Sequence, residues 1–471
     1  MNIQKPSANT CDWKKSFLWL ALAVACFHAA YASIQFPALG LFIFGYAYFL
    51  IRLTDQPNVR RAFYFGLATG FLCAAPQLFF FWKIFSVAAI MLWIVFAFWI
   101  GLFAAIVCGS IRRWGKAKAM WLIPIVWTGI EYFRSELYYL KFSWLNVGYA
   151  LPNFQLASLD VFGMYSVGFL VFLITATFSF RPILKKFQIL SIILIFVIPI
   201  ALFFTLNAAL RYKRISQLSL VGIQMEFPSV GILPKVLNQA LAKNTNAQIF
   251  VLSEYTLDSG VPDSLKNWCR DNSKFLVVGG KDVVTNHIYY NTVFVVGTNG
   301  EIIFKQAKSV PIQFFDDGLP APKQGVWNSP WGKIGICICY DLSYTRITDE
   351  LVKQGAQLLI VPTMDVSEWG KHEHELHSRV APVRAAEYGI PIFRLASSGI
   401  SQAVTGGGYV VAQTSFDKSG EILSAQLRLP THGSLPLDRF LAPICTGITA
   451  IVTAVLIFLN WKDNRAKSKS S

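Results

Sequence analysis

Three ionisable side chains end short apolar runs in the second half of the chain. Glu254 ends IFVLSE, Lys308 ends GEIIFKQAK, and Cys339 ends GICIC just before Tyr340 and Asp341. A carboxylate can remove the proton of a thiol, and the resulting thiolate is a nucleophile. An ammonium beside them would lower the thiol pKa and stabilise a developing oxyanion. Together the three residue types favour nucleophilic catalysis by Cys339, although singly each is an ordinary feature of a strand or loop.

The cysteines of this region also have an ordinary interpretation. Cys337 and Cys339 share one face of the expected strand, where a cysteine usually acts as a small buried apolar residue. Of the eight cysteines, three lie between residues 212 and 438, namely Cys269, Cys337 and Cys339. This odd count does not predict a disulfide scaffold.

Three histidines, His372, His374 and His377, gather in the segment HEHELH. The spacing differs from the HExxH zinc pattern, because position 376 is a leucine. No cysteine or carboxylate cluster elsewhere in the sequence completes a set of four ligands. We therefore expect a loop that leads into a helix, with no metal ion and no cofactor.

These side chains must be positioned by a layered α/β domain between Arg211 and about Asp438. Short β-rich runs separated by Gly, Pro, Asn and Asp alternate there with polar helical stretches, which is typical of such a domain. The expected strands are LSLVGIQ, AQIFVLSE, KFLVVGG, NTVFVVG, KIGICICY and AQLLIVPT.

The rest of the chain has the composition of a membrane protein. Hydrophobic residues make up 54% of the 471 residues and charged residues 14%, whereas a soluble domain has about 25% charged residues. A helix needs about 20 mostly apolar residues to cross a bilayer. We expect eight spans, at about 16–33, 36–51, 62–81, 85–108, 119–133, 160–180, 188–210 and 440–460. These spans contain few ionisable groups, which argues against a transporter.

The net charge of +16 is explained by the loops between the spans rather than by a nucleic-acid partner. Seventeen Lys and Arg residues fall on one side of the expected spans, and Lys83, Arg134 and Lys141 fall on the other. The positive-inside rule then predicts cytoplasmic termini and an extracytoplasmic 212–438 domain. A cleavable signal peptide ending near Ala32 is the alternative for the first span. The seventeen residues lie in 5–15, 52–61, 112–118, 181–186 and 462–469.

The order and approximate spacing of Glu254, Lys308 and Cys339 resemble the Glu–Lys–Cys triad of the nitrilase superfamily. With eight expected spans, the chain resembles the apolipoprotein N-acyltransferase family over essentially its whole length. A downstream segment carries further matches to that family, at Asp365, Trp369, Gly370, His377, Arg384, Glu387, Pro391, Arg394, Gly399 and Ser401.

The segment around Lys308 departs from the family pattern. Counting forward from Gly300 puts Lys308 in the lysine register, whereas counting back from Pro311 puts Gln306 there. We infer a two-residue deletion after Lys308 and keep Lys305 as the alternative lysine. The family's second, loop-borne glutamate has no clean counterpart, and Asp316 or Asp317 is expected to replace it.

The resemblance implies an N-acyltransferase that moves a fatty acyl chain from a phospholipid to the amine of an apolipoprotein's diacylglyceryl-cysteine. A ping-pong reaction through a thioester on Cys339 would use Glu254 as base. Lys308 and the Tyr340 backbone N–H would stabilise the oxyanion, with Asp341 beside them. Trp369 and His377 are candidate substrate-binding residues. A membrane-tethered amidase and an inactive binding protein of the same fold are the alternatives.

The implied architecture is a polytopic helical membrane domain with a nitrilase-like α-β-β-α sandwich. We place the membrane domain at 1–211, the catalytic domain at 212–438, and a last span with a basic tail at 439–471. The implied location is the bacterial inner membrane, with the catalytic domain in the periplasm. Aromatic residues of the outer loops are expected either to enter the membrane interface or to pack in the core: Phe142, Trp144, Phe314 and Phe315.

Overall fold

The computed structural model describes residues 13–32, 36–151, 159–180, 216–285 and 288–468. The chain divides into two compact units, each of which is continuous in space but not in sequence. The first unit contains residues 1–133, 165–193 and 440–471, and the second contains 134–164 and 194–439. Residues 134–164, which the sequence places in the membrane domain, therefore cluster with the α/β domain.

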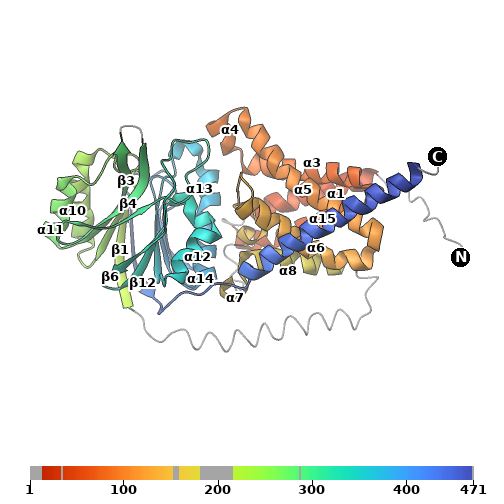
Figure 1. The fold of residues 1–471 in the computed structure, drawn as a ribbon. Helices are drawn as coiled ribbons and strands as arrows, with labels where there is room; N and C mark the ends of the chain where they lie inside the picture. Colours follow the sequence, from red (N-terminus) through yellow and green to blue (C-terminus); the bar gives the residue numbers. More distant parts are fainter. Residues whose placement is uncertain (1–12, 33–35, 152–158, 181–215, 286–287, 469–471) are drawn as a thin grey trace. The chain divides into compact units, whose positions relative to one another are not determined.

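The first unit is built of helices (Figure 1). Helices α3 and α5 pack closely, because a Cβ atom at Gly66 of α3 would lie 2.7 Å from the Ile100 carbonyl oxygen of α5. The helices of its described residues are α1 (Trp13–Tyr31), α2 (Phe42–Thr54), α3 (Val59–Gln77), α4 (Phe80–Phe85), α5 (Ala88–Trp114), α6 (Lys116–Tyr132), α8 (Met164–Ser179) and α15 (Asp438–Ser468).

Three helical segments of the described chain are long and apolar enough to cross a membrane: Pro37–Thr54, Ala88–Trp114 and Asp438–Ser468. Met164–Ser179 is apolar but shorter. The spans expected at 16–33, 62–81 and 119–133 are helical, as α1, α3 and α6, but are not among these three segments. The span expected at 188–210 lies outside the described residues. Apolar helices thus account for the hydrophobic composition.

The second unit contains two six-stranded sheets. The first sheet has the order β12 (Ile422–Leu429), β1 (Ser216–Ile223), β2 (Ile249–Leu252), β3 (Phe275–Thr285), β4 (Ile288–Val296) and β5 (Ile302–Ala307). The second has the order β11 (Val410–Gln413), β10 (Gln402–Val404), β9 (Ile392–Ala396), β8 (Leu358–Thr363), β7 (Gly332–Ile336) and β6 (Val326–Ser329). The six expected strands correspond to β1, β2, β3, β4, β7 and β8, which confirms them.

The two sheets pack face to face, and helices cover their outer faces (Figure 1). On β2, Ile249 and Val251 join the core between the sheets, whereas Phe250 and Leu252 join the core under the helices. Successive side chains of a strand point to opposite faces, so a strand buried on both faces is apolar throughout. The expected α-β-β-α sandwich is confirmed. Its outer helices are α10 (Leu233–Lys243) and α11 (Asp263–Asn272) on the first sheet, and α12 (Thr345–Lys353), α13 (Lys371–Ser378) and α14 (Val380–Tyr388) on the second.

Candidate active site

The candidate site lies where parallel strands of both sheets end. β7 and β8 are parallel neighbours, and Cys339 and Asp365 follow their carboxyl ends. In the first sheet β2 runs parallel to β3, and Glu254 follows β2. Chemistry is commonly placed beyond the carboxyl ends of parallel strands, because several chain segments emerge together there.

Cys339 occupies a sharp turn between β7 and the 3-10 helix η6 (Cys339–Ser343). Its φ is 53°, in the left-handed region that non-glycine residues rarely adopt. Strain of this kind gathers at functional sites and presents a side chain at a fixed angle. The expectation that Cys337 and Cys339 share a strand face was wrong, because β7 ends at Ile336.

Glu254 and Lys308 form a buried ion pair with Glu254 Oε1 and Lys308 Nζ 3.0 Å apart. The other carboxylate oxygen of Glu254 accepts the Met364 backbone N–H at 2.7 Å, and the Cys339 thiol donates to the Met364 carbonyl at 3.8 Å. Both catalytic candidates therefore contact one residue that follows β8. Gly279 permits this packing, because a Cβ atom there would lie 2.6 Å from Glu254 Cα.

Lys308 is held by two carboxylates, because Asp317 Oδ2 also lies 2.7 Å from its Nζ. Lys308 is completely buried, so its charge depends on these partners. Lys305 instead pairs with Asp282 in a partly exposed contact. Of the two aspartates expected to replace the missing loop glutamate, Asp317 is the one that pairs with Lys308. The two-residue deletion is compatible with this arrangement, since Lys308 still reaches Glu254.

The charges of the site set the pKa values of its groups. Burial raises the pKa of the Cys339 thiol well above its usual value, and the neighbouring Glu254 carboxylate adds to this effect. Burial also raises the pKa of Glu254, although Lys308 opposes the shift. Burial alone would lower the pKa of Lys308, but Glu254 and Asp317 together hold it well above normal. The resting nucleophile is therefore a protonated thiol that needs a base.

Asp341 ties the segment after Lys308 to the turn at Cys339. Its carboxylate accepts the backbone N–H groups of Ser309 at 2.9 Å and Val310 at 2.8 Å. Burial raises the pKa of Asp341 to about 6, although these backbone donors favour its charged form. Tyr340 points elsewhere, since its hydroxyl donates to the Lys141 carbonyl oxygen at 3.1 Å. Asp341 is thus placed to position the lysine segment.

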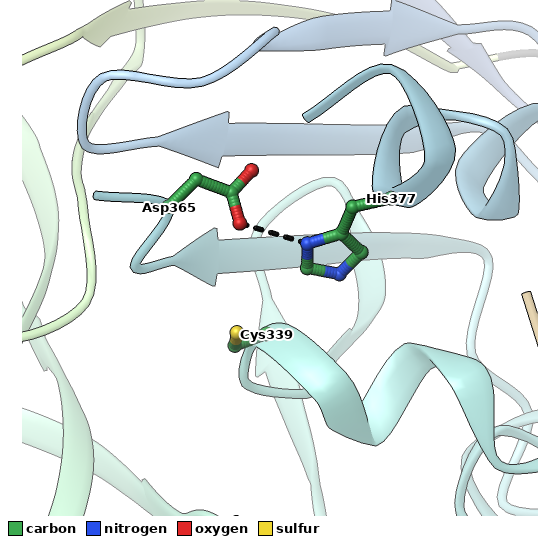
Figure 2. A group of neighbouring side chains, drawn as sticks. All are labelled: Cys339, Asp365 and His377. Carbon is green, nitrogen blue, oxygen red and sulfur yellow. Dashed lines mark hydrogen bonds and ion pairs between the residues drawn. The ribbon is translucent and has the colours of Figure 1, made fainter. Parts of the chain in front are cut away.

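A second buried pair faces the nucleophile. His377 Nδ1 lies 2.8 Å from Asp365 Oδ1, and Arg394 Nη2 lies 2.5 Å from Asp365 Oδ2. Cys339 Sγ, a carboxylate oxygen of Asp365 and a ring nitrogen of His377 all lie within 4.8 Å of one another (Figure 2). Asp365, Glu373 and His374 form a second such group. By distance either group could approach a metal ion, but both Asp365 oxygens already face the donors of His377 and Arg394.

Trp144 supports His377 from the segment 134–164. The two rings stack with centroids 4.5 Å apart and an interplanar angle of 20°. The Trp144 indole N–H donates to Ser343 Oγ at 3.0 Å. Trp144 is buried, so of its two expected roles the structure shows core packing. Trp369 lies elsewhere, with its ring 6.5 Å from that of Phe315.

We expect Trp144→Ala to lower the free energy of unfolding by about 3–5 kcal/mol, because it leaves a cavity beside His377. Trp144→Phe keeps an aromatic ring and loses one hydrogen bond, so its expected cost is about 1 kcal/mol. Unfolding in detergent with a denaturant measures both values. Equal losses in the two variants would contradict the stacking role of Trp144.

Asn291 is the residue at the site that sequence reasoning missed. Its side-chain amide donates to Glu254 Oε1 at 2.6 Å and to Asp317 Oδ1 at 2.8 Å, so it joins the two carboxylates. It lies on β4 and is completely buried. A single asparagine at the start of the apolar run NTVFVVG was the available signal, because a buried amide needs hydrogen-bond partners.

Comparisons with known proteins find relatives of both parts of the chain. Residues 225–436 match the carbon-nitrogen hydrolase family, and residues 23–177 match the apolipoprotein N-acyltransferase N-terminal domain. An apolipoprotein N-acyltransferase of Geobacter metallireducens is 23% identical over 90% of this chain and 92% of its own length. One of Shewanella oneidensis is 23% identical over 80% of this chain and 84% of its own length. A crystal structure of Saccharomyces cerevisiae Nit3, a member of branch 10 of the nitrilase superfamily, has a TM-score of 0.40 and 19% identity, over 46% of this chain and 92% of that chain.

The sandwich and its site define a domain of the nitrilase superfamily, joined in this chain to apolar helices. Both parts of the sequence match one kind of protein along most of its length. The chain belongs to the apolipoprotein N-acyltransferase family, and it is a membrane protein.

Proposed function

We propose that this protein transfers a fatty acyl chain from a phospholipid to the amine of a lipoprotein's diacylglyceryl-cysteine. The buried Glu254–Lys308 pair beside Cys339 is the observation that carries the proposal. It combines a base, a cation and a nucleophile in a site from which water is largely excluded. N-acylation of apolipoproteins, the activity for which the relatives are named, fits this chemistry.

In the first half-reaction Glu254 takes the Cys339 proton, and the thiolate attacks the ester carbonyl of the phospholipid. Lys308 has three donors, of which two face Glu254 and Asp317, so one can reach the oxyanion. The backbone N–H of Tyr340 is a second candidate donor. Glu254 then passes its proton to the departing lysophospholipid hydroxyl, and the acyl chain remains on Cys339 as a thioester.

In the second half-reaction the neutral amine of the acceptor attacks the thioester. The nitrogen–carbon bond forms, the carbon–sulfur bond breaks, and one proton passes from nitrogen through Glu254 to the Cys339 sulfur. This step restores the thiol and the carboxylate. The raised pKa of Glu254 suits both half-reactions, because a stronger base accepts a proton from a weakly acidic group more readily.

The apolar surface near the site suits lipid substrates. The loop that carries Asp317 also exposes Phe314, whose side chain is 69% accessible, and Phe315, on which Trp369 packs. Drawing an acyl chain out of a bilayer costs about 0.8 kcal/mol per CH₂ group. Aromatic side chains that contact the chain, in a protein tethered by apolar helices, would offset much of this cost.

We further propose that the catalytic unit faces the periplasm and that both termini are cytoplasmic. The seventeen Lys and Arg residues gathered on one side of the expected spans support this orientation. The substrates would then lie in the outer leaflet of the inner membrane. Labelling of single cysteines at either terminus in intact cells would test it.

Mass spectrometry of Cys339 tests the proposed function. We expect the purified protein, incubated with phospholipid, to gain one fatty acyl group on the peptide that contains Cys339. Neutral hydroxylamine should release this group as a thioester, and a diacylated lipopeptide should accept it as an amide. Cys339→Ala should gain no acyl group, because the nucleophile is missing.

Cys337→Ala is the matched control, since Cys337 is a buried cysteine two residues away that has no role in the mechanism. It should be acylated like the wild type. The proposal fails if the wild type gains no acyl group. It also fails if the group leaves only to water, which would indicate a hydrolase rather than a transferase.

A further inference from the structure

His377 carries a buried nitrogen that the proposed mechanism does not use. Among the described residues, its Nε2 atom has no hydrogen-bond partner, although the side chain is only 2% exposed. A buried polar atom without a partner destabilises the protein, because it has lost its hydrogen bonds to water. The ring of His377 belongs to the group of side chains around Cys339 Sγ, so the missing partner can arrive with a substrate that enters the site.

The partners of His377 determine what Nε2 can do. Arg394 and His377 hold the pKa of Asp365 well below normal despite its burial, so Asp365 is a carboxylate that can only accept. His377 Nδ1 must therefore carry the hydrogen of their 2.8 Å contact. Burial lowers the pKa of His377 to about 4, which keeps the ring neutral. Nε2 is then a bare acceptor.

The ring is fixed in place opposite the nucleophile. Trp144 stacks on one face of the imidazole, and Asp365 holds its Nδ1 edge. Figure 2 shows Cys339, Asp365 and His377 converging from three different segments, and their ligand-type atoms lie within 4.8 Å of one another. The acyl carbon of a Cys339 thioester would be one bond from Sγ. A group hydrogen-bonded to His377 can thus reach this carbon.

We infer that His377 Nε2 receives the acceptor amine and holds its nitrogen against the thioester carbonyl. The inference rests on the proposed function and names the residue that selects the acceptor. A neutral primary amine has two hydrogens. Glu254 takes one and returns it to the Cys339 sulfur, whereas the other stays on the amide nitrogen and is the one that His377 accepts.

The number of hydrogens on the attacking atom distinguishes the amine from the competing alcohol. The lysophospholipid hydroxyl, which can reverse the first half-reaction, has a single hydrogen. Glu254 removes this hydrogen during the attack, so no hydrogen remains for His377. The Asp365–His377 pair therefore favours the amine over the lysophospholipid. It speeds attack by the amine relative to attack by the alcohol, and it takes no part in the formation of the thioester.

His377→Phe tests this role, because phenylalanine keeps a ring against Trp144 and removes both nitrogens. The variant is first acylated with phospholipid, and the gain of the acyl group shows that the site has folded. Discharge of the thioester is then followed by mass in two arms, one with saturating diacylated lipopeptide and one with lysophospholipid. We expect discharge to the lipopeptide to slow by about 100-fold or more, with discharge to lysophospholipid unchanged.

Two further variants test whether the effect comes from the hydrogen-bond acceptor at position 377. His377→Gln retains a side-chain carbonyl that can accept an N–H, and it should recover much of the lipopeptide rate. His372→Phe makes the same substitution on the exposed side of α13 and should match the wild type in both arms.

The inference is overturned if His377→Phe discharges to the lipopeptide at the wild-type rate, or if it slows both arms equally. It is also overturned if the variant fails to acquire the acyl group. Failure of the wild type to become acylated would instead refute the proposed function, so the two failures are distinguishable.

Discussion

Glu254→Gln is expected to slow acylation of Cys339 by about 10²–10⁴-fold, the usual contribution of a positioned base. The thiol pKa is raised well above its usual value, so few thiolates form without help. Glutamine has nearly the same shape but cannot take the proton. The rate of acyl gain on Cys339 in a single turnover, followed by intact mass, measures the effect.

The pH dependence of the wild type should report the same base. Glu254 acts only as a carboxylate, and burial raises its pKa from the usual 4.5. Acylation should therefore fall as the pH drops through a value above 4.5, and Glu254→Gln should lack this limb. Glu301→Gln, at an exposed glutamate of the same unit, is the control and should behave as the wild type. Normal acylation by Glu254→Gln would exclude Glu254 as the base.

Lys308→Met is expected to abolish acylation and to lower the free energy of unfolding by about 3–5 kcal/mol. The lysine is completely buried between Glu254 and Asp317, whose carboxylates would be left without their cation. The oxyanion would lose its charged donor at the same time. Denaturant unfolding in detergent measures the stability, and acyl gain measures the chemistry.

Two comparisons separate these effects. Lys305→Met removes a partly exposed pair with Asp282 and should cost at most about 1 kcal/mol. Lys308→Met combined with Asp317→Asn removes one of the stranded charges and should regain stability but no acylation. If Lys308→Met proves as stable as Lys305→Met, the buried ion pair does not have the proposed importance.

The strands that carry the site could be read from the sequence. β2 and β8 are apolar on every residue or nearly so, because both of their faces are covered, and such runs are distinctive. Glu254 stood out because it is a charged residue two positions after such a run. β9 to β12 were not singled out, and β11, an edge strand, is exposed along most of its length, so its pattern carries little information.

The partners within the site could not be read in the same way. Asn291 and Asp317 lie 37 and 63 residues from Glu254 along the chain, and no local pattern records that they meet it. The choice between Lys305 and Lys308 depended on where β5 ends. Lys305 lies within β5 and pairs with Asp282, whereas Lys308 follows the strand and pairs with Glu254. The pairing of β4 with β5 places Lys308 beside Asn291, whose backbone carbonyl accepts the Lys308 backbone N–H at 2.8 Å. This contact is visible only in the folded structure.

The sequence alone determined the kind of fold, the apolar helices and the three residue types of the candidate triad. It could do so because the pattern of apolar residues and the spacing of polar ones are local properties of the sequence. The tertiary structure decided which atoms meet. It showed that His377 of the HEHELH segment pairs with Asp365. It also showed that Trp144, from a distant part of the sequence, stacks on the His377 ring. Contacts between distant segments depend on the packing of whole sheets, and their geometry exists only once the chain has folded.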